Sequence, residues 1–180
     1  MNRRKSSVRT KKVAVSAMLS ALGVVVLALG AIIEIMDLTT VAVASLCVFF
    51  AIIEMGSPFQ YFVYFATGFL SLILLPDKFA AIAYILFGGI YPVLKRIFER
   101  FPKILSWTAK ILYFNLILTA IIWLSLNILK ISGDDIGFSI AVYILGNVTF
   151  VLYDIAMTML ISFYLFKLRD RFRIGRYFEK

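Results

Sequence analysis

The segment VAVSAMLSALGVVVLALGAII, residues 13–33, decides the class of this protein. It contains no charged residue, and about 20 consecutive apolar residues are enough for a helix to cross the hydrocarbon layer of a bilayer. The rest of the chain has the same character, since 62% of its 180 residues are hydrophobic and only 16% are charged. A soluble domain averages about 45–50% apolar residues. The surplus predicts contact with lipid and excludes a soluble globular protein.

Six apolar runs separated by short polar stretches predict six membrane-spanning helices. The runs cover residues 13–33, 38–53, 59–75, 79–94, 111–129 and 138–166. The second, third and fourth runs are short against the ~17–25 residues of a typical span, which predicts thin or tilted spans, with a re-entrant pair as the alternative for the third and fourth. The expected fold class is an all-α membrane protein, a six-transmembrane-helix bundle.

The distribution of charge predicts the orientation of these spans. Segments 1–12, 95–110 and 167–180 hold 17 of the 19 Lys and Arg residues, and such residues accumulate on the cytoplasmic side of a membrane. We therefore expect a basic cytoplasmic N-terminus at 1–12, a membrane domain at 13–166 and a basic cytoplasmic tail at 167–180. The net charge of +9 then indicates topology and attraction to anionic membrane lipid, and no nucleic-acid partner is expected.

Segment 95–110 alternates apolar and charged side chains, as an amphipathic helix does. It predicts a cytoplasmic interfacial helix that lies in the headgroup layer with Trp107 at the interface, or a docking surface for a cytoplasmic partner. Lys95, at its start, is expected at the same depth as Glu54, so the two side chains are candidates for an ion pair that joins two helices.

The chemistry available to the chain is limited. It has no His and one Cys, which excludes histidine-based triads and histidine–zinc sites, so neither a metal nor a cofactor is expected. A single carboxylate in the membrane, Asp154, cannot act as both general acid and general base in one step. No Walker A motif occurs. We therefore expect a protein that is not an enzyme, and any nucleotide hydrolysis would belong to another protein.

The first span carries two ridges of small residues at helical spacing. One ridge is Ser16, Ser20 and Gly23, and the other, the candidate partner interface, is Ala14, Ala17 and Ala21. Small residues let helix backbones approach closely, which is a main source of helix association in lipid. The partner of the alanine ridge is either a helix of the same bundle or an external protein.

Asp154 lies near the middle of the sixth span. A carboxylate at that depth costs roughly 2.5–3.5 kcal/mol on insertion scales and by default marks a functional site. The alternative is a protonated or paired aspartate that joins helices, with Asn115 or Thr119 as partner. Gly88 and Gly89 raise a similar choice in the fourth span: a broken helix at a binding site, or close packing and a kink.

Polar and aromatic side chains also gather in the outer half of the later spans. Such a group suits a flat or amphipathic small molecule, held by stacking and a few hydrogen bonds. The candidate substrate-binding residues are Tyr84, Trp123, Asn127, Tyr143, Asn147 and Asp154.

Six helices with both ends inside, together with Ala14-Val-Ser-Ala17-Met-Leu-Ser-Ala21, resemble the substrate-binding S components of energy-coupling factor (ECF) transporters. In that family an Ala-x-x-x-Ala pattern on the first helix contacts a transmembrane coupling subunit, and Ala17 and Ala21 match this pattern. The resemblance implies a vitamin-like small-molecule ligand, a coupling subunit and ATPases as partners, and a multi-pass protein of the bacterial plasma membrane. The helical plan is also similar to the cell-shape protein MreD, so a scaffold that recruits partners or lipid is the alternative function.

Overall fold

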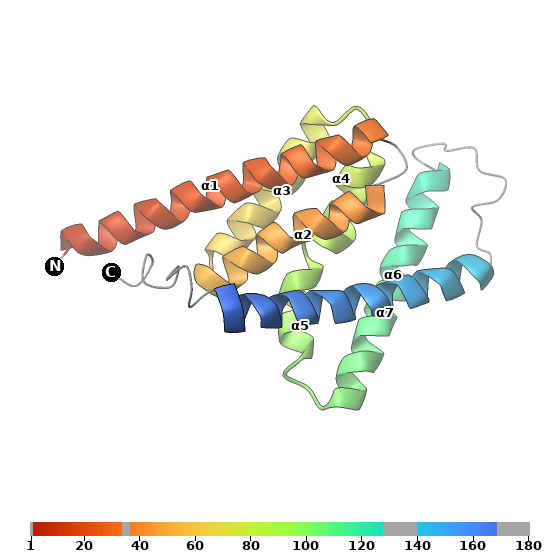
Figure 1. Ribbon diagram of the computed structural model, residues 1–180. Helices are drawn as coiled ribbons and strands as arrows, with labels where there is room; N and C mark the ends of the chain where they lie inside the picture. Colours follow the sequence, from red (N-terminus) through yellow and green to blue (C-terminus); the bar gives the residue numbers. More distant parts are fainter. Residues whose placement is uncertain (1, 34–36, 128–139, 169–180) are drawn as a thin grey trace.

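The computed structural model describes residues 2–33, 37–127 and 140–168, and side chains within 8–33, 37–124 and 140–167. Figure 1 shows that these residues form helices. The elements are α1 (Asn2–Ile33), α2 (Asp37–Glu54), α3 (Phe59–Leu74), α4 (Phe79–Ala83), the π-helical turn η1 (Tyr84–Gly88), α5 (Tyr91–Phe98), α6 (Lys103–Asn127), α7 (Ile140–Phe163) and the π-helical turn η2 (Tyr164–Leu168). The predicted all-α class is confirmed for this part of the chain.

Several of these helices are long and apolar enough to cross a membrane. Within the described residues, five stretches meet that standard: Val8–Ile33, Asp37–Glu54, Phe79–Phe98, Lys103–Leu124 and Ile140–Lys167. A sixth helix, α3, is apolar but shorter, with 16 residues. Large apolar side chains cover the outside of the bundle, as contact with lipid requires; on α3, Phe62, Phe65 and Phe69 are 63–66% exposed.

The apolar core is formed mainly by the first half of the chain. Helices α1, α2 and α3 pack side by side (Figure 1), and Leu27, Val48 and Val63 meet at their centre with no exposed surface. Helix α7 runs across α5 and α6 on another side of the bundle (Figure 1) and has only three buried residues, Phe150, Asp154 and Met157. The attachment of α7 therefore depends on a few contacts.

The fourth span is broken, and close packing accompanies the break. It runs as α4, η1 and α5, with Gly88 and Gly89 at the junction. A methyl group at Gly88 would lie 2.6 Å from Val41 Cγ1, and one at Gly89 would collide with the Tyr64 ring. Tyr64 also donates a hydrogen bond of 3.0 Å to the carbonyl of Ile85 in the π-helical turn. A side chain at either glycine would therefore force a residue packed against it to move.

Residues 95–110 do not form the single helix that was predicted. The segment instead contains the end of α5, a turn at 99–102, and the first two turns of α6. The break occurs at Pro102, which has no N–H to continue a helix and disfavours helical conformation in the residue before it. Its carbonyl accepts the N–H of Ser106 at 2.9 Å, which starts α6. Consequently Lys95 and Lys110 belong to the two flanking helices.

Candidate functional site

Asp154 is the buried centre of a group of charged and polar side chains, which we call the charge cluster; Glu99, with a side chain 49% exposed, is at its edge. Its members come from α5, α6, α7 and the turn after α5: Tyr91, Lys95, Glu99, Lys110, Asp154 and Thr158. The exposed fractions of Asp154, Lys95 and Lys110 are only 2%, 1% and 4%. Charges at such depth are costly unless they are paired and hydrogen-bonded.

Every oxygen of the Asp154 carboxylate has a donor. Oδ1 accepts hydrogen bonds from Lys95 Nζ and from the Tyr91 hydroxyl, the latter at 2.5 Å. Oδ2 accepts a hydrogen bond from Lys110 Nζ at 3.0 Å. Asp154 therefore joins α7 to both α5 and α6.

The two lysines share a second carboxylate. Glu99 Oε1 lies 3.1 Å from Lys95 Nζ and 3.5 Å from Lys110 Nζ. Lys95 also donates to the Thr158 hydroxyl at 2.9 Å. With two cations and two carboxylates the charge cluster has no net formal charge, which suits a site of low dielectric constant.

These contacts bear on two expected pairings. Asp154 is paired and joins helices, but its partners are Lys95 and Lys110, not Asn115 or Thr119. The predicted ion pair between Lys95 and Glu54 is wrong, because the Lys95 ammonium is directed to Asp154 and Glu99.

A second polar line joins α6 to α7 beyond the charge cluster. The side-chain amides of Asn115 and Asn147 exchange two hydrogen bonds, at 2.9 and 3.0 Å. One helical turn further on, the hydroxyls of Thr119 and Tyr143 lie 2.8 Å apart. We call these four side chains the α6–α7 seam.

The structure brings only some of the candidate substrate-binding residues together. Asp154, Tyr143 and Asn147 follow one side of α7, in the charge cluster and the seam. Tyr84 is fully buried in the core and lies beside the Tyr64 ring, with centroids 6.4 Å apart. Trp123 is 54% exposed.

Asn127, the remaining candidate, is the last residue of α6. Its side chain lies outside the described residues.

One of the two ridges of α1 faces into the bundle, and the other faces outward. Ser16, Ser20 and Gly23 are buried, and a methyl group at Gly23 would lie 2.9 Å from Thr67 Cγ2 on α3. The alanine ridge, Ala14, Ala17 and Ala21, is exposed. The ridge that packs within the bundle is therefore the serine–glycine one.

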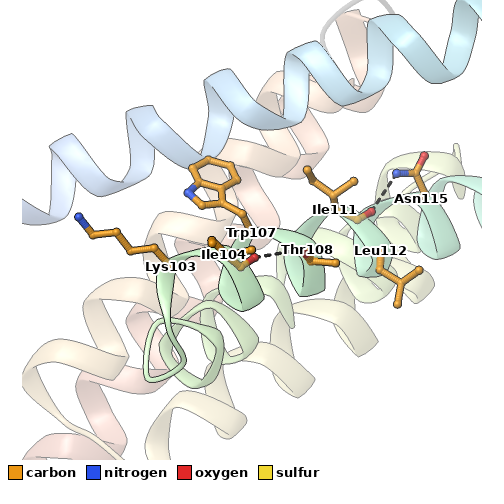
Figure 2. Close-up of a pocket in the computed structure, with 7 residues that line it drawn as sticks. All are labelled: Lys103, Ile104, Trp107, Thr108, Ile111, Leu112 and Asn115. Carbon is orange, nitrogen blue, oxygen red and sulfur yellow. Dashed lines mark hydrogen bonds between the residues drawn. The ribbon is translucent and has the colours of Figure 1, made fainter.

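An open groove runs along α6, and Figure 2 shows the residues that line it. We call it the α6 groove; its volume is about 860 Å³. Its lining residues are Lys103, Ile104, Trp107, Thr108, Ile111, Leu112 and Asn115. Sequence reasoning missed it because Trp107 and its neighbours were assigned to an interfacial helix.

The charge cluster, the seam, the alanine ridge and the α6 groove are thus the features from which a function has to be inferred. Comparison of the chain with protein-family models, with curated proteins and with solved structures finds no match.

Proposed function

We propose that this chain is a non-enzymatic membrane subunit that binds a small molecule and works only when the alanine ridge of α1 is docked against a helix of a partner membrane protein. The partner and its ATPases supply the energy for uptake, as the resemblance to ECF S components implies. The proposed setting is the bacterial plasma membrane, with both termini in the cytoplasm. The observation that carries the proposal is the outward position of Ala14, Ala17 and Ala21.

The physical reason is that small residues promote helix association only where the backbone of another helix comes close. Lipid tails fill space beside any side chain, so helix association in a membrane depends on van der Waals packing between backbones. The inner ridge shows such an approach, between Gly23 and Thr67. On the outer face, Met18 and Leu22 flank the alanines and are 72% and 54% exposed. Large side chains beside a shallow row of alanines form a surface that a second helix fits.

The small-molecule site of this proposal is the outer half of the α6–α7 seam, where Tyr143 and Asn147 supply a hydroxyl and an amide. Trp123 of α6 adds an exposed indole on the same half of that helix. A ligand would replace the hydrogen bonds that Thr119 and Asn115 now make. These existing bonds are also the observation that favours the second candidate, a scaffold, in which the seam only holds α6 against α7.

Purification from native membranes tests the proposal. Ala17→Leu enlarges the ridge and is expected to abolish recovery of a membrane partner together with its ATPases, while the isolated chain stays folded. Ala156→Leu is the matched control, because Ala156 is an exposed alanine on α7; it should leave recovery unchanged.

Mass spectrometry of the same preparations separates the two candidates. A small molecule bound to the wild-type chain and lost in Asn147→Leu supports the binding subunit. A partner without ATPases or ligand supports the scaffold. Equal recovery of the partner with Ala17→Leu and with wild type would refute docking through the alanine ridge.

A further inference from the structure

We propose that the α6 groove is a binding site for one phospholipid with an anionic headgroup, whose headgroup lies at Lys103 and whose acyl chain follows the groove toward Asn115. The lipid belongs to the leaflet next to the turn at 99–102. This inference does not depend on the proposed transport function.

The length of the groove matches one leaflet. Lys103 and Asn115 are 12 positions apart on one helix, which corresponds to ~18 Å at 1.5 Å per residue. Half of a ~30 Å hydrocarbon layer is of similar length. The groove therefore reaches from the headgroup region to about the middle of the bilayer.

The lining residues follow the order of the parts of a phospholipid, from the charged headgroup to the acyl chain. Lys103 is at one end, Trp107 follows about one turn later, and Ile111 and Leu112 lie deeper. Figure 2 shows these side chains along successive turns of α6. Indole rings favour the membrane–water interface, and the deeper aliphatic side chains suit an acyl chain. Leu112 is 70% exposed, so an acyl chain can enter the groove from the membrane.

The charge at the mouth of the groove is positive. Glu99 is already paired with the buried Lys95 and Lys110. Lys103 is exposed, as are Arg96 in the last turn of α5 and Arg100 in the turn between the helices, and within the described residues none of these three side chains has an ion pair with a carboxylate. The excess positive charge complements an anionic headgroup and distinguishes it from a zwitterionic one.

The groove is held in shape by contacts that involve no lipid. Lys110 Nζ lies 5.2 Å from the centroid of the Trp107 ring, a cation–π contact, and Lys110 is itself fixed by Asp154. At the deep end, Asn115 is paired with Asn147 of α7. The site is therefore preformed, unlike an ordinary lipid-facing surface that adapts to whichever chains surround it.

Quenching of Trp107 fluorescence by brominated lipids tests the proposal directly. The chain has two tryptophans, so Trp123→Phe leaves Trp107 as the only reporter. The protein is placed in phosphatidylcholine vesicles containing increasing fractions of brominated phosphatidylglycerol, or of brominated phosphatidylcholine. We expect half-maximal quenching at a several-fold lower fraction of the anionic lipid. Equal fractions for the two lipids would overturn the proposal.

Two variants in the Trp123→Phe background locate the site. Lys103→Gln is expected to remove the preference for phosphatidylglycerol, whereas Lys167→Gln, at another exposed lysine, should keep it. Thr108→Phe fills the groove and should weaken quenching by both lipids. Thr149→Phe is its matched control, since Thr108 and Thr149 are exposed threonines that each donate to the carbonyl four residues earlier. Retained preference in Lys103→Gln, or unchanged quenching in Thr108→Phe, would contradict lipid binding in the groove.

Discussion

Removal of the Asp154 charge is the perturbation with the most specific expected consequence. In Asp154→Asn the two buried lysines of the charge cluster face a single carboxylate, that of Glu99. Breaking a buried ion pair by removing one partner costs about 3–5 kcal/mol, because a charge is left uncompensated. We expect a loss of this order in the free energy of unfolding, since Lys95 and Lys110 each have an exposed fraction below 5%.

A second substitution should recover much of that loss by restoring neutrality. Asp154→Asn with Lys110→Met leaves Lys95 and Glu99, whose charged atoms are 3.1 Å apart. Asp154→Asn with Lys95→Met leaves Lys110 and Glu99, at the longer distance of 3.5 Å. The first double variant should therefore be the more stable of the two, and both should be more stable than Asp154→Asn alone.

Equilibrium unfolding in detergent micelles, followed by circular dichroism, measures these differences. The coupling between positions 154 and 110 is obtained from a double-mutant cycle. The reasoning would be refuted if Asp154→Asn were as stable as wild type, or if Lys110→Met added its own full loss to that of Asp154→Asn.

Three further predictions concern packing and the seam. Gly89→Ala should destabilise the protein by about 1–3 kcal/mol, the usual cost of overpacking, because the added methyl group collides with the Tyr64 ring; an unchanged melting temperature in detergent would contradict this. Gly146→Ala should be close to neutral or slightly stabilising, since its methyl group would lie 3.1 Å from the flexible end of Leu118 and at ordinary contact distance, 3.5–3.6 Å, from the Phe114 ring, and alanine favours helix; a large drop in melting temperature would count against it. Asn147→Leu should cost about 1 kcal/mol, the scale of interhelical hydrogen bonds in membranes, and pairing it with Asn115→Leu should cost less than the sum of the two single changes; strict additivity in the unfolding free energies would show that the two amides are not coupled.

The sequence predicts the helices well because the signal is local. A long apolar run such as residues 13–33 needs a helix to satisfy its backbone in lipid, whatever the neighbouring helices do. Asp154 is singled out for the same kind of reason, since one carboxylate in an apolar run has to find a partner.

The partners of Asp154 could not be predicted because they depend on where a neighbouring helix begins. Pro102 places the start of α6 at Lys103, which puts Lys110 two turns inside the helix. Reading the same residues as one interfacial helix left Lys95 and Lys110 at the membrane surface. The wrong helix boundary therefore placed both lysines at the membrane surface in the prediction, instead of beside Asp154.

Periodicity also shows which residues share a face of a helix without showing which way that face points. In α1, the alanine ridge and the ridge with Ser20 and Gly23 have equivalent spacing, and tertiary packing, such as that of Thr67 against Gly23, distinguishes the inner one. Tyr84 and Trp123 show the same limitation, because both were expected at one pocket and are respectively buried in the core and exposed.

The most direct test of the proposed function is photo-crosslinking in living cells. A photoreactive amino acid replaces Ala17 in one strain and Ala156 in another, so that the two probes lie on exposed faces of α1 and α7. We predict that the probe at position 17 crosslinks to one membrane protein which also assembles with ATPases, and that the probe at position 156 does not. Crosslinks from position 17 to lipid alone, or the same protein partner from both positions, would contradict docking through the alanine ridge.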